Sequence, residues 1–282
     1  MLNVNFIILF FLIISLQAFT VYLDNRCNIF DFFIKIKRGK IATAYTNRGI
    51  YLTISRAIFF IVESDKIKKY FSQYTDMPIK VIPYKFFNQR LHIENKNKSI
   101  VSIVIPGVVD LDRKNLKIFI DALEMIQPAK RKKIQIIFLG NANSSLDQCK
   151  KWKKKFANSF VYFEGFVPAE VFERYMINAN LIGSSLVLDH QCRYLNEVYG
   201  TSKGSGVFGQ SISYGKPLLV NTGFEVPSMI ESSSVFFSNA SDLSSIYNKL
   251  IQDDCFISEI SDLAIENSSF FTIDEISNRF NI

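Results

Sequence analysis

The strongest chemical signal in the chain is the segment Lys203-Gly204-Ser205-Gly206, which opens a helix predicted over 204–214. Two glycines within three residues let the backbone approach a ligand and turn its N–H groups toward it. The helix N-terminus adds partial positive charge, which favours a bound phosphate or diphosphate, and Lys203 supplies a full charge beside it. A plain glycine-rich turn with an N-cap serine has the same sequence, so both interpretations stay open.

A second signal is the cation pair Arg113-Lys114, which follows Gly107 and stands at the start of a helix predicted over 113–126. Adjacent cations at this position oppose the helix dipole, which prefers anions at the N-terminus. A bound diphosphate would resolve the conflict, because arginine offers a bidentate fork and lysine a point charge. The alternative is that Asp110 and Asp112 neutralise the pair.

Alternating strands and helices from residue 100 onward position these segments. A parallel sheet with helices on both faces is therefore expected, and its ligand should lie beyond the carboxyl ends of the strands. The predicted strands are 99–106, 134–139, 160–163, 181–186, 217–220 and 235–237. The predicted helices are 113–126, 144–156, 168–179, 204–214, 241–252, 256–266 and 272–281. The loops on the ligand side are 107–114, 140–144, 165–168, 184–204 and 221–226.

The first hundred residues predict part of a second α/β domain. Strands are expected over 57–62 and 79–83, with a helix over 64–74 between them, and the polar stretch 88–98 is expected to be a linker. Hydrophobic residues make up 48% of the chain and charged residues 21%, which is typical of a folded protein with a real core.

The net charge of +7 is unevenly distributed. Residues 1–99 hold 15 Lys and Arg against 6 Asp and Glu, whereas residues 100–282 hold 18 against 20. The positive charge accompanies the most hydrophobic segment, which suits an anionic membrane surface better than nucleic acid. A solvated basic face is the alternative.

The apolar run Val4–Phe19 is interrupted only by Asn5, Ser15 and Gln17. It is shorter than the roughly 20 residues that span a bilayer, and it lacks the positive n-region and cleavage site of a signal peptide. We therefore expect a buried helix or one lying in the membrane interface, with a signal anchor as the alternative.

The four cysteines show no ligand spacing that would favour zinc, and nothing in the sequence requires a disulfide, which agrees with a reducing cytoplasm. They are Cys27, Cys149, Cys192 and Cys255.

Four sequence blocks within residues 103–220 resemble, in order and spacing, the C-terminal half of GT-B glycosyltransferases of the family 4-like group. The blocks are IPG…RKNL…DAL, IFLGNA, VYFEGFVP…VFERY…ANLI and YGTSKGSGVFGQSISYGKPLLV. The resemblance implies that a nucleotide sugar binds as the donor substrate, without a separate cofactor or metal.

The resemblance also implies roles for individual residues. The donor diphosphate would lie on Lys114, with Arg113 adjacent, and on the glycine-serine loop. The nucleobase would be held largely by backbone groups of Gly165, Phe166 and Val167, and the ribose hydroxyls by Gln210. The loop residues are Lys203, Gly204, Ser205 and Gly206.

The chain departs from the family's Glu-x7-Glu motif, whose two glutamates become Ser202 and Gln210. A glutamine amide still accepts a hydrogen bond from a ribose hydroxyl. Ser202 does not replace the first glutamate in kind, which leaves the identity of the sugar open.

Candidates for catalysis are few. A retaining enzyme of this fold needs mainly stabilisation of the leaving group, whereas an inverting enzyme needs a general base on the acceptor side. His190, in a predicted loop on the ligand side, and Asp24, after the apolar segment, are the candidate catalytic residues, with an ordinary loop histidine as the alternative for His190. His92 lies in the predicted linker and is expected to be a surface residue.

The resulting prediction is an α/β protein of GT-B-like architecture. Residues 96–282 would form a C-terminal, Rossmann-like, nucleotide-sugar-binding domain, and residues 1–95 a reduced, membrane-proximal domain on the acceptor side. The expected activity is a metal-independent, hexosyltransferase-type transfer to a lipid-linked or polysaccharide acceptor in surface glycan biosynthesis. The expected location is cytoplasmic, peripheral on the inner face of the membrane, and no nucleic-acid partner is expected.

Two other functions stay open. One is a catalytically impaired remnant or partner subunit that binds another glycosyltransferase. The other is a flavodoxin-like or other phosphate-binding α/β domain, which the absence of G-x-G-x-x-G and Walker sequences disfavours.

Overall fold

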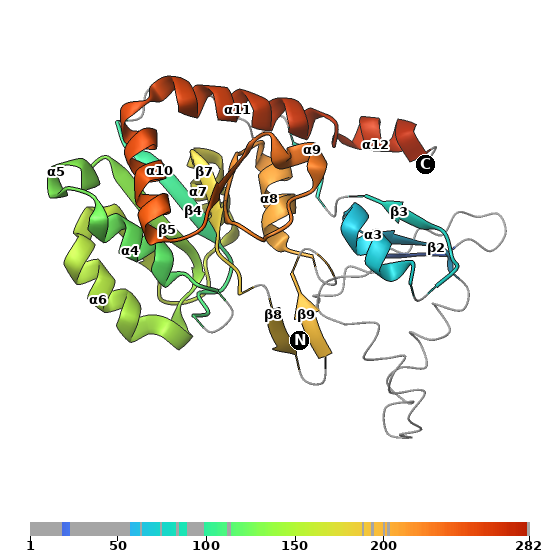
Figure 1. The fold of residues 1–282 in the computed structure, drawn as a ribbon, viewed down its shortest axis with the longest axis horizontal. Coiled ribbons are helices and arrows are strands. Elements are labelled where there is room, and N and C mark those ends of the chain that lie inside the picture. Colours follow the sequence, from blue (N-terminus) through green and yellow to red (C-terminus); the bar gives the residue numbers. More distant parts are fainter. Residues whose placement is uncertain are drawn as a thin grey trace. The chain divides into compact units, whose positions relative to one another are not determined.

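The computed structural model forms two compact units. One comprises Met1–Tyr84 with Asp189–Ser205, and the other comprises Lys85–Leu188 with Gly206–Ile282. Figure 1 shows the chain coloured along its sequence. The structure describes residues 19–22, 57–62, 64–73, 75–82, 85–88, 99–111, 114–187, 189–192, 195–199, 201 and 204–280.

The larger unit is built on a six-stranded parallel sheet with the order β11-β10-β7-β4-β5-β6. From its first strand, β4, the chain adds β5 and β6 on one side and then returns to add β7, β10 and β11 on the other. This is the strand order of doubly wound, Rossmann-type sheets, as predicted. The strands are β4 (Val101–Pro106), β5 (Ile134–Asn141), β6 (Phe160–Phe163), β7 (Leu181–Ser184), β10 (Leu218–Asn221) and β11 (Ser234–Phe237).

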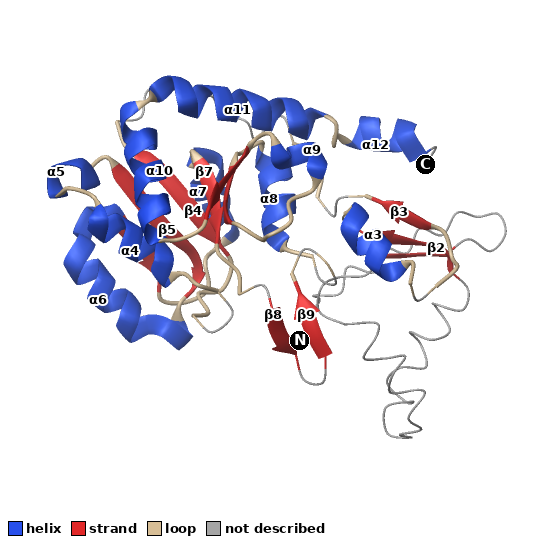
Figure 2. Cartoon of the chain, viewed as in Figure 1, coloured by secondary structure: helices blue, strands red, loops and turns tan. Residues whose placement is uncertain are grey.

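Helices flank this sheet (Figure 2). Successive strand residues point to opposite faces, so Ile103 and Ile105 pack in the core formed with α4, α6 and α10, while the fully buried Val104 points the other way. On that second side α7 contacts β4 and α8 contacts β7. The helices are α4 (Lys117–Met125), α5 (Pro128–Arg131), α6 (Leu146–Phe156), α7 (Ala169–Asn178), α8 (Gly206–Tyr214), α9 (Ser228–Glu231), α10 (Ala240–Gln252), α11 (Asp254–Ser269) and α12 (Ile273–Phe280), with 3-10 turns η2 (Asn143–Ser145) and η3 (Ala157–Ser159).

The smaller unit contains a three-stranded parallel sheet of order β1-β2-β3 and a separate antiparallel hairpin. Its helix begins after Ser64, whose hydroxyl oxygen accepts a hydrogen bond from the Ile67 N–H at 3.3 Å, and its core includes Phe60, Phe71 and Ile79. The elements are β1 (Phe19–Tyr22), β2 (Ala57–Val62), α3 (Asp65–Phe71), β3 (Ile79–Val81), β8 (Asp189–Cys192) and β9 (Leu195–Val198). The α/β arrangement of the described residues in this part of the chain agrees with the prediction.

Three local predictions were wrong. The helix expected from residue 113 begins at Lys117, the loop expected over 184–204 contains the β8–β9 hairpin, and Phe19, expected at the end of a helix, begins β1. The rest of the apolar run and most of the predicted linker lie outside the described residues. Among the helices that the structure describes, none is long and apolar enough to cross a membrane. The domain boundary at residues 95 and 96 stays a prediction.

Candidate functional site

The order of the large sheet defines one position where a ligand site is expected. β4 and β7 are neighbours, and the chain leaves them in opposite directions, toward β5 from β4 and toward β10 from β7. The loops that follow these two strands therefore diverge at the carboxyl edge of the sheet, which is where ligands bind in open α/β sheets. The described segments at this edge are 107–111 and 114–116 after β4 and 185–187 after β7.

The loop after β4 is fixed on the end of β5. The N–H of Gly107 donates to the carbonyl of Leu139 at 3.0 Å, and the N–H of Val109 donates to that of Asn141 at 3.0 Å. Gly107 has a φ of +91°, a conformation that favours glycine. A Cβ on Gly140 would lie 2.1 Å from the Gly107 carbonyl oxygen, so the two backbones meet only because residue 140 is glycine.

The side chain of Lys114 turns back across this loop. Its Nζ donates to the carbonyl oxygen of Val108 at 2.9 Å and to that of Pro106, the last residue of β4, at 3.3 Å. The structure therefore places a cation at the carboxyl end of β4, where the sequence predicted a diphosphate contact.

The reason given for that prediction was partly wrong. Lys114 is not in the first turn of α4, since the helix begins at Lys117. It forms a β-bridge with Leu186 instead, and the next N–H, of Asn115, donates to the carbonyl of Ser185 at 2.9 Å. These contacts hold the chain beside the end of β7, so α4 begins only at Lys117. Arg113 and Asp112 lie outside the described residues.

Asn221 joins a third strand end to the same edge, a role that sequence reasoning missed because no motif marks it. It is the last residue of β10; its Oδ1 accepts from the Leu186 N–H at 3.1 Å and its Nδ2 donates to the Leu186 carbonyl at 3.3 Å. Leu186 thus joins the segments that follow β4 and β7 to the end of β10. The edge has a defined backbone before any ligand binds.

The predicted glycine-serine loop leads directly into α8. Gly204 and Ser205 are buried, and the exposed Gly206 is the first helical residue, so the helix begins two residues later than predicted. The first turn of a helix leaves N–H groups without partners inside the helix, which suits an anion. Lys203 and Ser202 lie outside the described residues.

Gln210, in the second turn of α8, carries an unusual buried atom. Its Oε1 has no hydrogen-bond partner, and among the residues that the structure describes it is the only buried side-chain nitrogen or oxygen in that state. Leaving such an acceptor unsatisfied costs about 1–3 kcal/mol. A ligand that donates an O–H or N–H would remove this cost, and the sequence resemblance had assigned Gln210 to hydroxyl groups.

The predicted nucleobase segment connects β6 to α7. Nothing lies within 4 Å of the position that a Cβ on Gly165 would take, Phe166 is 87% exposed, and Val167 is buried. This loop is at the same sheet edge as Lys114, two strands away, since β5 separates β4 from β6. An exposed phenylalanine beside an open glycine leaves backbone and ring accessible to a planar group.

Neither catalytic candidate belongs to the described segments that form this edge. His190 lies in β8 opposite Glu197 of β9, in the smaller unit, and Asp24 lies outside the described residues. His92 does as well. Throughout the described part of the chain, no group of three or more His, Cys, Asp or Glu side chains is placed to hold a metal ion.

No protein-family model matches the sequence, and no curated protein matches it either. Solved structures do match. HepE from Anabaena in complex with UDP is 16% identical with a TM-score of 0.60, covering 80% of this chain and 63% of its own. Sucrose-phosphate synthase from Thermosynechococcus elongatus is 13% identical with a TM-score of 0.59, covering 95% and 67%.

The lipopolysaccharide outer core galactosyltransferase WaaB is 14% identical with a TM-score of 0.55, covering 81% of this chain and 62% of its own. The chain thus spans less than two thirds of the HepE and WaaB chains. At these identities the likeness concerns the fold. The chain has the GT-B-like α/β fold of nucleotide-sugar-dependent glycosyltransferases.

Proposed function

We propose that this chain binds a nucleotide sugar at the carboxyl edge of the six-stranded sheet and transfers the sugar to an acceptor. The observation that carries the proposal is the Lys114 ammonium group, held by two backbone carbonyls at the end of β4, where the strand order reverses. A fixed cation there suits a diphosphate. Structures with this fold have been solved with UDP and with UDP-glucose.

The remaining donor contacts extend this assignment. The first turn of α8, entered through Gly204, Ser205 and Gly206, would offer N–H groups to the diphosphate, with Lys203 and Arg113 as further cations. The unpartnered Oε1 of Gln210 would accept from a ribose hydroxyl. The backbone of Gly165–Val167 would hold the nucleobase.

The proposed reaction breaks the bond between the anomeric carbon and the donor diphosphate and forms one to an acceptor oxygen. Negative charge develops on the departing diphosphate, so Lys114 and the N–H groups of α8 would stabilise the transition state. The acceptor hydroxyl loses its proton, to the departing phosphate in a retaining reaction or to a general base in an inverting one. His190 and Asp24 are the candidates for that base.

The proposed acceptor and location follow from the N-terminal segment. A lipid-linked or polysaccharide acceptor in surface glycan synthesis fits an apolar, basic N-terminal segment that docks on the inner face of the membrane. The transfer would be of the hexosyl type. It would be metal-independent, since Lys114, Lys203, Arg113 and helix N–H groups can neutralise the leaving group.

A nucleotide-sugar panel tests the proposal directly. Thermal shift and calorimetry with UDP-glucose, UDP-galactose, UDP-N-acetylglucosamine and GDP-mannose should show saturable binding of at least one donor to the wild-type chain. Lys114→Ala should lose that binding, whereas Lys117→Ala, which removes an exposed lysine paired with Asp121, should keep it. Absence of binding to every nucleotide sugar would reject the proposal.

A second candidate is a partner subunit that retains donor binding without transfer. The serine at position 202, where the family has a glutamate, favours it. Restoring the glutamates with Ser202→Glu and Gln210→Glu should then create donor hydrolysis or transfer that the wild-type chain lacks. Transfer by the unmodified chain alone would dispose of this candidate.

A further inference from the structure

A dense group of lysines lies on α5, on the turn after it and on α6. Between Pro128 and Phe160 the chain carries nine Lys and Arg residues against a single acid, Asp147. We refer to six of these lysines as the basic surface. They are Lys130, Lys132, Lys133, Lys150, Lys151 and Lys154.

The packing of α6 fixes the direction of its lysines. Cys149, Trp152 and Phe156 are buried on the inner side of the helix, at steps of three and four residues. Trp152 lies edge-on to Phe138 and to Phe160, with ring centroids 6.0 Å apart in each case. The exposed Lys150, Lys151 and Lys154 therefore project outward from a rigidly anchored helix.

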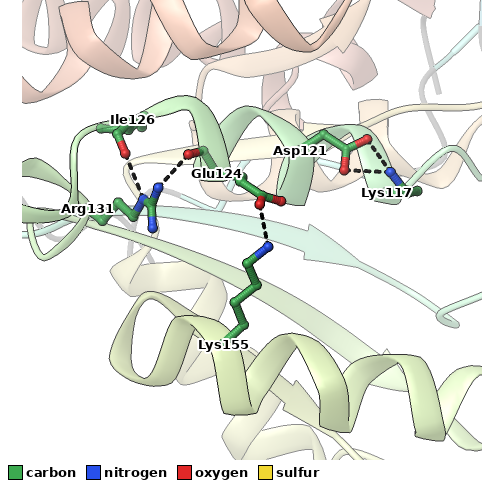
Figure 3. A network of polar contacts seen from close by, with 6 residues as sticks. All are labelled: Lys117, Asp121, Glu124, Ile126, Arg131 and Lys155. Carbon is green, nitrogen blue, oxygen red and sulfur yellow. Dashed lines mark hydrogen bonds and ion pairs between the residues drawn. The ribbon is translucent and has the colours of Figure 1, made fainter.

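Arg131 connects α5 to the end of α6. Its Nε donates to the Ile126 carbonyl at 2.7 Å and its Nη2 to that of Glu124 (Figure 3). The Arg131 carbonyl accepts from the Ser159 hydroxyl at 2.8 Å. Its guanidinium also lies 5.7 Å from the centre of the Phe156 ring. These contacts join the segment that carries Lys130, Lys132 and Lys133 to the C-terminal end of α6.

Three of the nine cationic side chains bind other groups of the protein. Arg131 binds the carbonyls just described, Lys155 pairs with Glu124, and Lys153 donates to the carbonyls of Ala157 and Phe160 at 2.7 and 2.9 Å. The six lysines of the basic surface form no ion pair with any residue that the structure describes. Like charges at helical spacing repel one another, so this charge destabilises the free protein and favours an anionic partner.

The side chains favour a lipid surface over nucleic acid. Arg131, the one arginine between Pro128 and Phe160, donates to backbone carbonyls, and the aromatic rings of α6 are buried. Neither a guanidinium group nor an exposed ring on this surface is therefore available to contact bases. Lysine ammonium groups suit diffuse attraction to headgroups. Met125, 59% exposed at the end of α4, adds an apolar contact beside α5. We propose that the basic surface docks on anionic phospholipid headgroups.

Vesicle sedimentation of the full chain tests this proposal. The triple variant Lys150→Gln, Lys151→Gln, Lys154→Gln is compared with Lys117→Gln, Arg174→Gln, Lys249→Gln, which removes three exposed cations from other helices or from the far end of α4. Each lysine near an anionic surface contributes roughly fivefold to binding. The first triple variant should therefore bind vesicles with 30% phosphatidylglycerol at least tenfold more weakly, and the second should bind within about twofold of wild type.

The controls separate this proposal from the donor site. Both triple variants should stay folded and keep nucleotide-sugar binding, since none of the substituted residues is among the proposed donor contacts. Pure phosphatidylcholine vesicles should bind all three proteins weakly. Equal sedimentation of the two triple variants, or tighter binding of single-stranded RNA than of anionic vesicles, would overturn the proposal.

Discussion

The ammonium group of Lys114 donates a hydrogen bond to the carbonyl oxygen of Val108 at 2.9 Å, across a loop that begins at the end of β4. The hydrogen bond orders both the lysine side chain and the loop. The carbonyl keeps the flexible lysine side chain at one place, and the lysine keeps the loop closed over Gly107. A charge that is positioned before a ligand arrives loses less conformational freedom on binding, which favours affinity.

Removing the unsatisfied Oε1 of Gln210 should have opposite effects on the stability of the protein and on donor binding. Gln210→Leu should leave the ligand-free protein as stable as wild type or raise its free energy of unfolding by about 1 kcal/mol, because a buried acceptor without a partner is removed. The same variant should bind a nucleotide sugar more weakly. Urea denaturation and calorimetry measure the two effects.

Gln135 provides the matched control. Its Nε2 donates to the Asn158 carbonyl at 3.0 Å, so Gln135→Leu should lower the free energy of unfolding and leave donor binding unchanged. Equal stability losses in the two variants would contradict an unsatisfied Gln210.

The contact between Gly140 and Gly107 predicts that no side chain is tolerated at residue 140. A Cβ there would meet backbone atoms, which cannot rotate away, so Gly140→Ala should cost about 2 kcal/mol or more of the free energy of unfolding. Gly165→Ala is the control and should stay within about 0.5 kcal/mol of wild type, since nothing lies within 4 Å of its Cβ position. Guanidinium unfolding curves of equal midpoint would refute this contact.

Ala157, at the end of α6, is the one residue other than glycine with a positive φ, +41°, in the part of the chain that the structure describes. Such a conformation costs an alanine about 1–3 kcal/mol. Ala157→Gly should therefore raise the melting temperature, whereas Ala129→Gly in α5 should lower it, as glycine normally does in a helix. Calorimetric scans of both variants measure the difference, and a lower melting temperature for Ala157→Gly would count against strain at this residue.

Burial raises the pKa of the Cys149 thiol to about 11. An unfolded cysteine ionises near pH 8.5, so the folded state keeps the proton over a range in which the unfolded state releases it. The stabilisation is complete below about pH 8.5 and is lost as the pH rises to about 11. The melting temperature of Cys149→Ala should therefore decline less steeply than that of wild type across this range. Parallel declines in the two proteins would show that Cys149 does not contribute.

Periodicity along the sequence predicted the large sheet well, because each of its strands is a short apolar run between helices of clear amphipathic pattern. β6 of this sheet has the predicted bounds, and so does β2 of the smaller unit. The start of α4 was missed because it depends on Lys114 and Leu186, which are remote in sequence and paired in the fold. The β8–β9 hairpin was missed because no Asn-Gly or Asp-Gly turn marks it.

Sequence reasoning identified polar side chains of the candidate site but not the residues that hold its backbone in place. Lys114 and Gln210 were identifiable from residue type and from the family resemblance. The contributions of Gly140 and Asn221 were not, because each depends on contact with the backbone of a segment that the sequence does not place beside it.

Isothermal titration of the full chain with UDP-glucose and the other nucleotide sugars, for wild type and for Lys114→Ala, tests the central claim most directly. We expect saturable binding of at least one donor to the wild-type chain, at least tenfold weaker in Lys114→Ala and unchanged in Lys117→Ala. Equal affinities of wild type and Lys114→Ala for that donor would contradict the assignment of Lys114 to the donor diphosphate.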